Sequence, residues 1–340
     1  KSIELATNAM NQLTRQQDYN NAGYSMSLMG SCYWQLGLYD SALSSHHTAV
    51  GLREKSGNWS GQAFSWTRLG DMYKESGSKK RSLEAYDKAL DIYRKLADSS
   101  GLAEVYAAKG QVYLDDENYK NAVVYFEKAN GVSHKSTVEA LFKLGISWSS
   151  LDTVKARKYF QESRLKSRQD GNTSYQFLSA KAMARMAYYN QDKKSGDVYF
   201  NECVTLAGQM NTPNADAQIL GLKAYRLECE TALDSALLYY RKAMLITDSV
   251  DKGSSVDYLT SMASIFISMG DFKQADESLT SGIRLAREIS DSLSLGNSLQ
   301  FSSFLYSRTA EFDRGLKNND SAIAIFQQSG HQIRLASTYT

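Results

Sequence analysis

The strongest constraint on this chain is a glycine that recurs at a long, nearly constant interval. Gly30, Gly70, Gly110 and Gly145 each stand three positions before an aromatic residue, at intervals of 40, 40 and 35 positions. Glycine has no side chain, so it lets a facing helix approach closely. A contact repeated at a fixed period predicts a row of similar units, each packed on its neighbours.

The best preserved copy of this pattern surrounds Gly70. Trp66, Leu69 and Tyr73 recur at helical spacing, so they share one helix face that packs on a partner helix. Ala89 is the small residue that keeps the second helix close to its neighbours. The stretch therefore predicts two helices joined by a turn, with Gly70 at their interface.

The composition extends this prediction to the whole chain. Pro213 is the single proline among 340 residues, whereas an average composition has about 5% proline. Proline is the main breaker of helices, so its near-absence favours helix almost throughout. No segment alternates apolar and polar residues over the length of a strand. We therefore expect an all-α fold.

The stretch around Gly70 resembles the signature of the tetratricopeptide repeat (TPR), in which W-x-x-L-G-x-x-Y is followed by Y-x-x-A. The residues that carry it are Trp66, Leu69, Gly70, Tyr73, Tyr86 and Ala89. The resemblance covers nearly the whole chain, most strongly from Met29 to Phe160 and more weakly after Thr173. It implies an α-solenoid of antiparallel helix pairs, wound into a right-handed superhelix whose concave groove binds a peptide or protein segment.

The period departs from the usual repeat of about 34 residues, because most units here run near 40. The extra residues are expected to lengthen the helices by roughly one and a half turns. Long repeats of this kind are similar to those of bacterial signalling proteins, including peptide-sensing regulators, sensor kinases and protease-associated regions.

We expect one array over residues 1–340, with an unfinished repeat at each end. The predicted units are a partial repeat 1–16, repeats 18–55, 59–97, 100–131, 136–168, 173–210, 213–250, 253–290 and 292–329, and a partial repeat 331–340. Short polar segments between them, such as those at 56–61 and 290–294, can end one helix and cap the next. The unfinished ends indicate a piece of a longer protein, and they leave open a homodimer formed through them.

Charge, hydropathy and cysteine spacing exclude several functional classes for this chain. The net charge of +2, from 39 basic and 37 acidic residues, gives no footprint for nucleic acid. No apolar run reaches the ~20 residues of a membrane span. The three cysteines have no metal or redox spacing, which slightly favours a reducing compartment such as the cytoplasm. A periplasmic location stays open if the full-length protein has a signal peptide.

No catalytic or nucleotide-binding motif is present, so we expect no enzyme activity and no cofactor or metal. The two adjacent histidines at 46 and 47 are the nearest approach to a reactive cluster. His46 stands where Tyr86 and Phe126 stand in sister units, so we interpret it as a packing residue and His47 as its solvated neighbour.

The first helix of each unit should line the groove. Counting from each glycine-like position, we expect residues six and three before it, and one, four and five after it, to face a partner. The predicted groove residues are Tyr24, Trp34, Gln35, Phe64, Thr67, Asp71, Lys74, Gln111, Asp115, Phe142, Asn190, Gln191 and Tyr225. Rings can bury apolar side chains and amides can pair with a peptide backbone. In the alternative interpretation, Phe64, Phe142 and Phe304 fill the core between repeats.

The sequence therefore predicts a non-catalytic scaffold that binds a protein or peptide segment. The acidic residues at the predicted groove positions, Asp71 and Asp115 among them, disfavour a highly acidic tail as ligand. A narrower hypothesis is that the chain is the sensory or regulatory region of a bacterial signalling protein, whose effector domain lies outside it. An enzyme built on the same scaffold is a third hypothesis, without a motif in its support.

Overall fold

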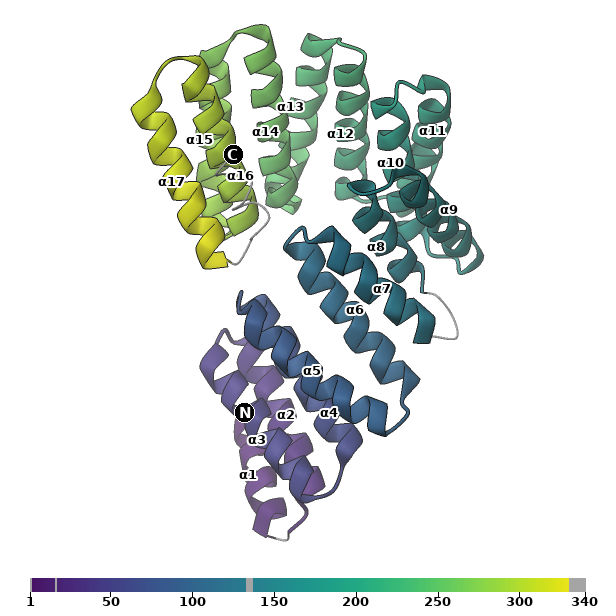
Figure 1. Ribbon diagram of the computed structural model, residues 1–340, viewed down its shortest axis with the longest axis vertical. Coiled ribbons are helices and arrows are strands. Elements are labelled where there is room, and N and C mark those ends of the chain that lie inside the picture. The colour runs from purple at the N-terminus through teal and green to yellow at the C-terminus, as the bar shows by residue number, and fades with distance from the viewer. Residues whose placement is uncertain (1, 16, 133–136, 330–340) are drawn as a thin grey trace. The chain divides into compact units, whose positions relative to one another are not determined.

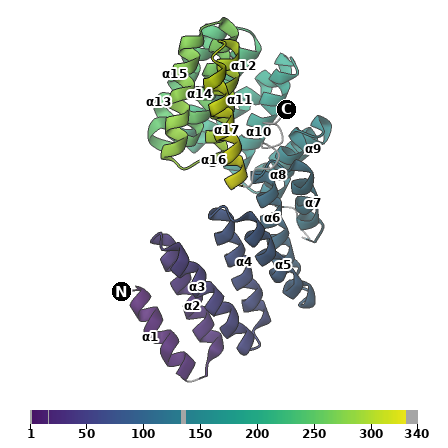
Figure 2. The same ribbon diagram turned by 60° about the vertical axis from the view of Figure 1, so that its left-hand side comes forward.

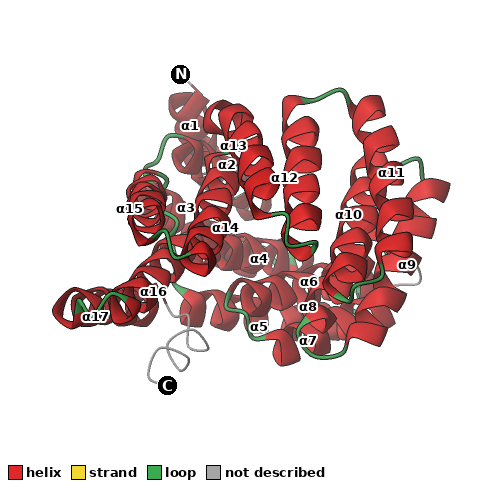
Figure 3. Ribbon diagram, turned by 90° about the horizontal axis from the view of Figure 1, so that it is seen from above, coloured by secondary structure: helices red, strands yellow, loops and turns green. Residues whose placement is uncertain are grey.

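The computed structural model describes residues 2–15, 17–132 and 137–329 (Figure 1). Within these ranges the chain consists of α-helices joined by short turns, and they contain no strand (Figure 3). The predicted all-α fold is confirmed. The predicted partial repeat at 331–340 lies outside the described residues. No helix in the described ranges combines the length and apolar character that a membrane crossing needs.

The chain divides into two compact units, residues 1–140 (unit 1) and residues 141–340 (unit 2). The single array with the repeat boundaries given above stays a prediction. The helices of unit 1 are α1 (Ser2–Arg15), α2 (Tyr19–Gln35), α3 (Tyr39–Lys55), α4 (Trp59–Glu75), α5 (Lys79–Lys95), α6 (Ser99–Asp115) and α7 (Tyr119–Val132). Helix α8 (Val138–Ser149) begins in unit 1 and ends in unit 2.

In unit 2 the helices from α12 to α17 lie side by side in chain order (Figures 1 and 2). The helices of unit 2 after α8 are α9 (Thr153–Gln169), α10 (Thr173–Tyr189), α11 (Lys193–Met210), α12 (Pro213–Cys229), α13 (Leu233–Val250), α14 (Lys252–Met269), α15 (Phe272–Glu288), α16 (Ser292–Arg308) and α17 (Phe312–Ser329). Even-numbered helices from α10 onward are the first helices of their pairs, and odd-numbered helices are the second.

The long period comes from long helices joined by short turns. The helices from α2 to α6 are each 17 residues long. In unit 1 a residue in the left-handed conformation marks successive turns at a constant interval, and two such intervals make one period. These turn residues are Gln17, Gly37, Gly57, Gly77, Ala97 and Glu117, with φ between 51° and 74°. The extra residues of the period therefore lie in the helices, as the sequence predicted.

Each turn also supplies a cap for the following first helix. Asp18, Asn58 and Asp98, which hold the same place in successive pairs, accept a hydrogen bond from the backbone N–H three positions later, at 3.2, 2.8 and 3.0 Å. Asp291 does the same in unit 2, where Ser294 is the donor at 3.0 Å. A side chain that accepts these otherwise unpaired N–H groups fixes where a helix begins. The polar segments act as the sequence predicted.

The recurring glycines lie against large rings of the following helix. A Cβ atom on Gly70 would lie 2.4 Å from Cε1 of Tyr86, and one on Gly110 would lie 2.8 Å from the Phe126 ring. Tyr86 is fully buried, and its hydroxyl donates to Asp71 at 2.7 Å. The prediction that Gly70 lies at the helix interface is confirmed.

His46 occupies the corresponding place in the preceding pair. It is 1% exposed, and a Cβ on Gly30 would lie 2.4 Å from its Cδ2. Neither ring nitrogen of His46 has a hydrogen-bond partner among the described residues. The prediction that His46 is a packing residue is confirmed. The neighbouring His47 is exposed, with Nε2 2.9 Å from the hydroxyl oxygen of Tyr73.

A buried arginine joins α3 to α4, and we expect its replacement to destabilise the chain. Arg53 is 5% exposed, and its Nη1 donates to the Gly61 carbonyl at 2.8 Å and to Ser65 Oγ at 2.7 Å. Both bonds come from Nη1, which lies one covalent bond farther from Cα than the Nζ atom of a lysine, so a lysine does not reach the two acceptors in the same way. Arg53→Lys should therefore cost on the order of 1–2 kcal/mol of unfolding free energy in urea. The exposed Arg94→Lys is the control, and an equal effect at both positions would contradict this role.

Candidate functional site

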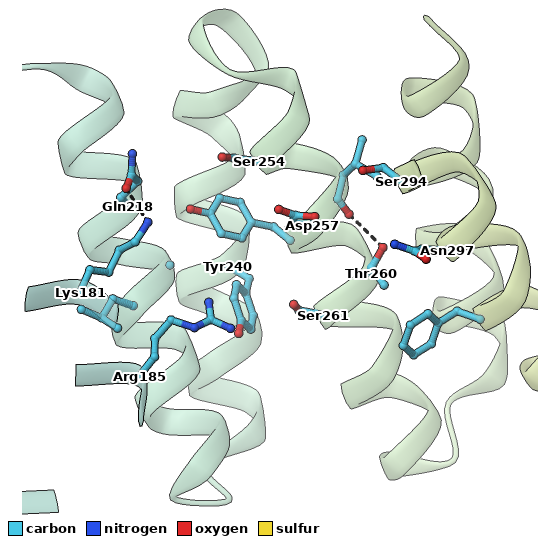
Figure 4. A pocket seen from close by; sticks show the side chains of 15 residues that line it. Lys181, Arg185, Gln218, Tyr240, Ser254, Asp257, Thr260, Ser261, Ser294 and Asn297 are labelled. Carbon is cyan, nitrogen blue, oxygen red and sulfur yellow. Dashed lines mark hydrogen bonds between the residues drawn. The ribbon is translucent and has the colours of Figure 1, made fainter. Parts of the chain in front are cut away.

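A polar hollow of about 440 Å³ lies in unit 2 along the first helices α10, α12, α14 and α16, with Tyr240 contributed by α13 (Figure 4). Its volume lies within the range of known ligand sites. The polar side chains that line it include Lys181, Arg185, Gln218, Asp257, Thr260 and Asn297. We refer to these residues as the lining of the polar hollow.

The lining follows the repeat register. Gly70 stands seven positions before the left-handed Gly77, and in unit 2 the same place is held by Ala184, Ala224, Ala263 and Ser303, seven positions before Gln191, Thr231, Gly270 and Ala310. Counted from these small residues, Gln218, Asp257 and Asn297 all stand six before, and Lys181 and Thr260 stand three before. The same face of successive first helices therefore turns toward one hollow.

Helix α10 places two cations on one side of the polar hollow. Lys181 Nζ donates to Gln218 Oε1 at 2.6 Å, and Gln218 Nε2 donates to Asn214 at 3.2 Å, so α12 holds the ammonium group in place. Burial, together with the positive charge of Arg185, lowers the pKa of Lys181 to about 8. The Arg185 guanidinium lies 4.4 Å from the centre of the Tyr225 ring.

Helices α14 and α16 place polar groups on the other side. Asp257 on α14 and Asn297 on α16 reach into the polar hollow from the side away from Lys181 (Figure 4). The pKa of Asp257 is raised because the surrounding protein displaces water and because Asp291 adds negative charge. Tyr258 also lines the polar hollow, and its hydroxyl donates to the Ala217 carbonyl at 3.3 Å.

A second, apolar hollow of about 340 Å³ adjoins the first. Its lining includes Ile146, Ala182, Met186, Tyr189 and Tyr225, together with Arg185 and Asn190. Arg185 lines both hollows, so the two are neighbours along α10. Together they offer a surface with an apolar part and a charged part.

The repeat sequence itself matches known families. Two family models, both described as tetratricopeptide repeat, match the chain, one over residues 21–95 and the other over residues 103–133 and 256–289. These segments of the chain are tetratricopeptide repeats. The match in unit 2 includes α14, the helix that carries Asp257.

Several solved structures resemble this chain at low sequence identity. The apo form of RapI is 15% identical with a TM-score of 0.71, covering 85% of this chain and 84% of RapI. Aspartyl phosphate phosphatase F from Bacillus subtilis is 14% identical with a TM-score of 0.63, and the match covers 81% of this chain and 73% of the phosphatase. NprR in complex with its cognate peptide NprX is 14% identical with a TM-score of 0.61, covering 90% and 97%. No curated protein sequence matches the chain significantly.

In unit 2, the predicted groove residues fall into three groups. Asn190 and Tyr225 come together in the apolar hollow. Gln191 is an exposed turn residue with φ of 59°. Phe142 packs in the core, with its ring centre 5.6 Å from both Phe160 and Tyr175. Phe142 therefore follows the alternative in which it fills space between repeats.

In unit 1, Tyr24 and Phe64 are 65% and 42% exposed, whereas Thr67 is only 1% exposed. The Thr67 hydroxyl donates to the Ala63 carbonyl at 3.0 Å, so the prediction that Thr67 faces a ligand is wrong. A threonine in a helix satisfies its hydroxyl in this way when it is buried.

The other predicted residues of unit 1 have partners within the chain or lie at the ends of helices. Gln111 donates to Asp115 at 2.5 Å, Asp71 accepts from Arg68 and Tyr86, and Trp34 packs edge-on against Tyr39. Gln35 is exposed and Lys74 half-buried, both in the last turn of their helices. A hollow of about 480 Å³ in unit 1, lined from α6, α7 and α8, includes Glu104 and Ala107, which stand six and three positions before Gly110.

The lining of the polar hollow is absent from the predicted groove residues. The predicted residues Asn190 and Gln191 are counted from Met186, which stands two positions beyond the small residue Ala184. The same offsets select Lys181, Gln218, Asp257 and Asn297 when they are counted from Ala184 and the other small residues of unit 2. The distance of seven positions from each small residue to the following left-handed turn residue could have identified these positions.

Cys203, whose thiol pKa is clearly shifted, is not a reactive cysteine. Cys203 is fully buried, and burial raises the pKa of its thiol to about 12. A thiol with such a pKa stays protonated at neutral pH and is a poor nucleophile. Among the described residues, no three His, Cys, Asp or Glu side chains gather into a group that could hold a metal ion.

Proposed function

We propose that this chain is a non-catalytic scaffold that binds an extended peptide or protein segment along the first helices of unit 2. The observation that carries the proposal is the pair of adjoining hollows on one helix face, joined at Arg185. One hollow is apolar and the other is lined by polar groups that converge from α10, α12, α14 and α16. NprR, which shares the fold, was solved with its cognate peptide NprX, and this supports a peptide as the ligand.

The two hollows fit the two needs of peptide recognition. Met186, Tyr189 and Tyr225 can bury an apolar side chain, which supplies most of the binding free energy in such sites. Asn190 and Asn297 each carry an amide that both donates and accepts, which suits backbone N–H and C=O groups. An extended segment, whose backbone groups are free, can use both.

A second candidate is the sensory or regulatory region of a bacterial signalling protein whose effector domain lies outside this chain. The observation in its favour is the fold shared with aspartyl phosphate phosphatase F over 81% of this chain. The coding sequence on either side tests it directly. A kinase, protease or DNA-binding domain beside the repeats would support this candidate, and flanks without any effector domain would contradict it.

The apolar hollow gives a direct test of peptide binding. A random linear peptide library would be selected on the immobilised full chain, and the affinity of the enriched peptides measured by fluorescence polarisation. We expect Tyr225→Ala to weaken binding about tenfold or more, because it removes a ring from the hollow.

The control for this test is Tyr239→Ala. Tyr239 on α13 lies outside the lining of both hollows and, like Tyr225, carries a cation over its ring, Lys223 at 4.2 Å. This variant should bind the selected peptides as the wild type does. Failure of any peptide to enrich, or equal losses in the two variants, would contradict the proposed function.

A further inference from the structure

The polar hollow holds charges of both signs that do not pair with each other. Lys181 and Arg185 form no ion pair with a carboxylate among the described residues, and Asp257 forms none with a cation. Among the described residues, the side-chain hydrogen-bond partner of Lys181 is the neutral amide of Gln218. The site therefore carries a cationic side on α10 and an anionic side on α14.

Two half-buried arginines of unit 2 form ion pairs with carboxylates. Arg164 meets Glu202 at 2.9 Å between α9 and α11, and Arg226 meets Asp197 at 3.0 Å between α12 and α11. Holding a charge among protein atoms without a partner of opposite charge, as at the half-buried Lys181, is unfavourable. The half-buried Lys181 thus differs from the half-buried Arg164 and Arg226, each of which has a carboxylate partner.

A bound molecule with complementary charges would relieve this arrangement. Arg185 and Asp257 stay open to solvent, so such a molecule can reach both. A carboxylate can accept hydrogen bonds from the Lys181 ammonium and the Arg185 guanidinium together, since these stand four positions apart on one face of α10. A cationic group can donate to the Asp257 carboxylate across the hollow. The apolar hollow is lined from α8, α9, α10 and α12, whereas Asp257 is on α14, and Arg185 on α10 lines both hollows.

We propose that the ligand of unit 2 is a peptide with an apolar residue, an acidic group and a basic group in that order along the first helices. The apolar residue enters the hollow of Met186 and Tyr225, the acidic group binds Lys181 and Arg185, and the basic group binds Asp257. This inference rests on the proposed function, because it names the chemistry of the peptide that the same site would bind. The acidic group is either a side-chain carboxylate or the C-terminal carboxylate of the peptide.

The test is a selection on the full chain with two random linear peptide libraries. One library leaves the C-terminus of the peptide free, and the other joins it to the carrier. On the wild type we expect enrichment of peptides with an apolar, an acidic and a basic group in order. Internal Asp or Glu enriched in both libraries identifies a side-chain carboxylate, whereas enrichment confined to free C-termini identifies the terminal one.

Charge-removing variants locate the contacts. The double variant Lys181→Met, Arg185→Met should lose the preference for acidic groups, and Asp257→Asn should lose the preference for basic groups. Each variant should lower the affinity for the selected peptides about tenfold or more, as the loss of a charged hydrogen bond does. Lys242→Met and Asp248→Asn on the exposed side of α13 are the matched controls. They should change neither the charge preference of the selection nor the affinity for the selected peptides. Unchanged thermal midpoints confirm that the variants are folded.

The outcomes separate this inference from the proposed function. Peptides that enrich without charge preference, and bind the charge-removing variants as well as the wild type, overturn the inference while leaving peptide binding in place. A selection in which no peptide enriches overturns both. A charge preference that the Lys242 and Asp248 controls abolish equally would also overturn it, because the contacts would then lie outside the polar hollow.

Discussion

Replacing Gly70 with leucine is expected to lower the free energy of unfolding by about 1–3 kcal/mol or more. The reason is geometric, because even the Cβ atom of a side chain at this position would lie 2.4 Å from Cε1 of the fully buried Tyr86. Tyr86 cannot move away freely, since its hydroxyl donates to Asp71 at 2.7 Å. Urea unfolding followed by circular dichroism measures the loss.

Gly51 provides a matched control in the same unit. It lies within α3, and a Cβ at this position would meet no other atom within 4 Å. Gly51→Leu removes a poor helix former without a clash, so it should leave the chain unchanged or stabilise it by about 0.5–1 kcal/mol. If Gly70→Leu proved as harmless as Gly51→Leu, the close packing of α4 on α5 would be refuted.

Acid should destabilise the chain through His46. Burial, followed by the nearby charges of Arg53, Arg68 and His47, lowers the pKa of His46 from 6.5 to about 4 in the folded state. Between these values the unfolded state binds a proton at this position and the folded state does not. Stability is therefore fully present above pH 6.5 and falls as the pH drops toward 4, by as much as about 3 kcal/mol.

The variant His46→Phe isolates this contribution. Phenylalanine is the residue that fills the same place beside Gly110, where Phe126 is fully buried. We expect the unfolding free energy of His46→Phe to fall less than that of the wild type between pH 7 and pH 4, with the difference appearing below pH 6.5. Parallel pH profiles for the two proteins would contradict a neutral, buried His46.

The contacts that hold each helix pair together could be predicted from the sequence because their residue types are distinctive. A glycine in the first helix and a large ring at a constant distance along the second mark Gly70 with Tyr86, and Gly110 with Phe126. The same spacing identified His46 as a packing residue although histidine is an unusual choice there. Polar residues after each helix likewise marked the caps, as at Asn58.

The register of α10 in unit 2 could not be predicted from these marks. The small residue there is Ala184, one of several alanines in α10, and the left-handed turn residue is Gln191 in place of a glycine. The glycine and ring are also exchanged, since Gly196 on α11 lies against Tyr188 on α10 at 2.4 Å from an added Cβ. With both marks changed, an offset of two positions hid Lys181 and Arg185 on α10, whereas the register of α12 was right, since the predicted Tyr225 stands one position after Ala224.

Which individual polar side chains are buried could not be predicted from the sequence either. Thr67 and Asp71 stand at positions expected to face a ligand, yet the first is covered by packing and the second accepts from Arg68 and Tyr86. A polar residue type does not reveal whether its partner is a ligand, water or another part of the chain. That distinction requires the positions of the neighbouring helices.

Photo-cross-linking is the most direct test of where a partner binds. A library-selected peptide that carries a benzophenone in place of its apolar residue would be irradiated on the full chain, and the adducts located by mass spectrometry. Our account predicts adducts on α10 and α12, at segments that contain Met186 and Tyr225. Adducts confined to unit 1, or to the second helices α11 and α13, would contradict the placement of the binding site on the first helices of unit 2.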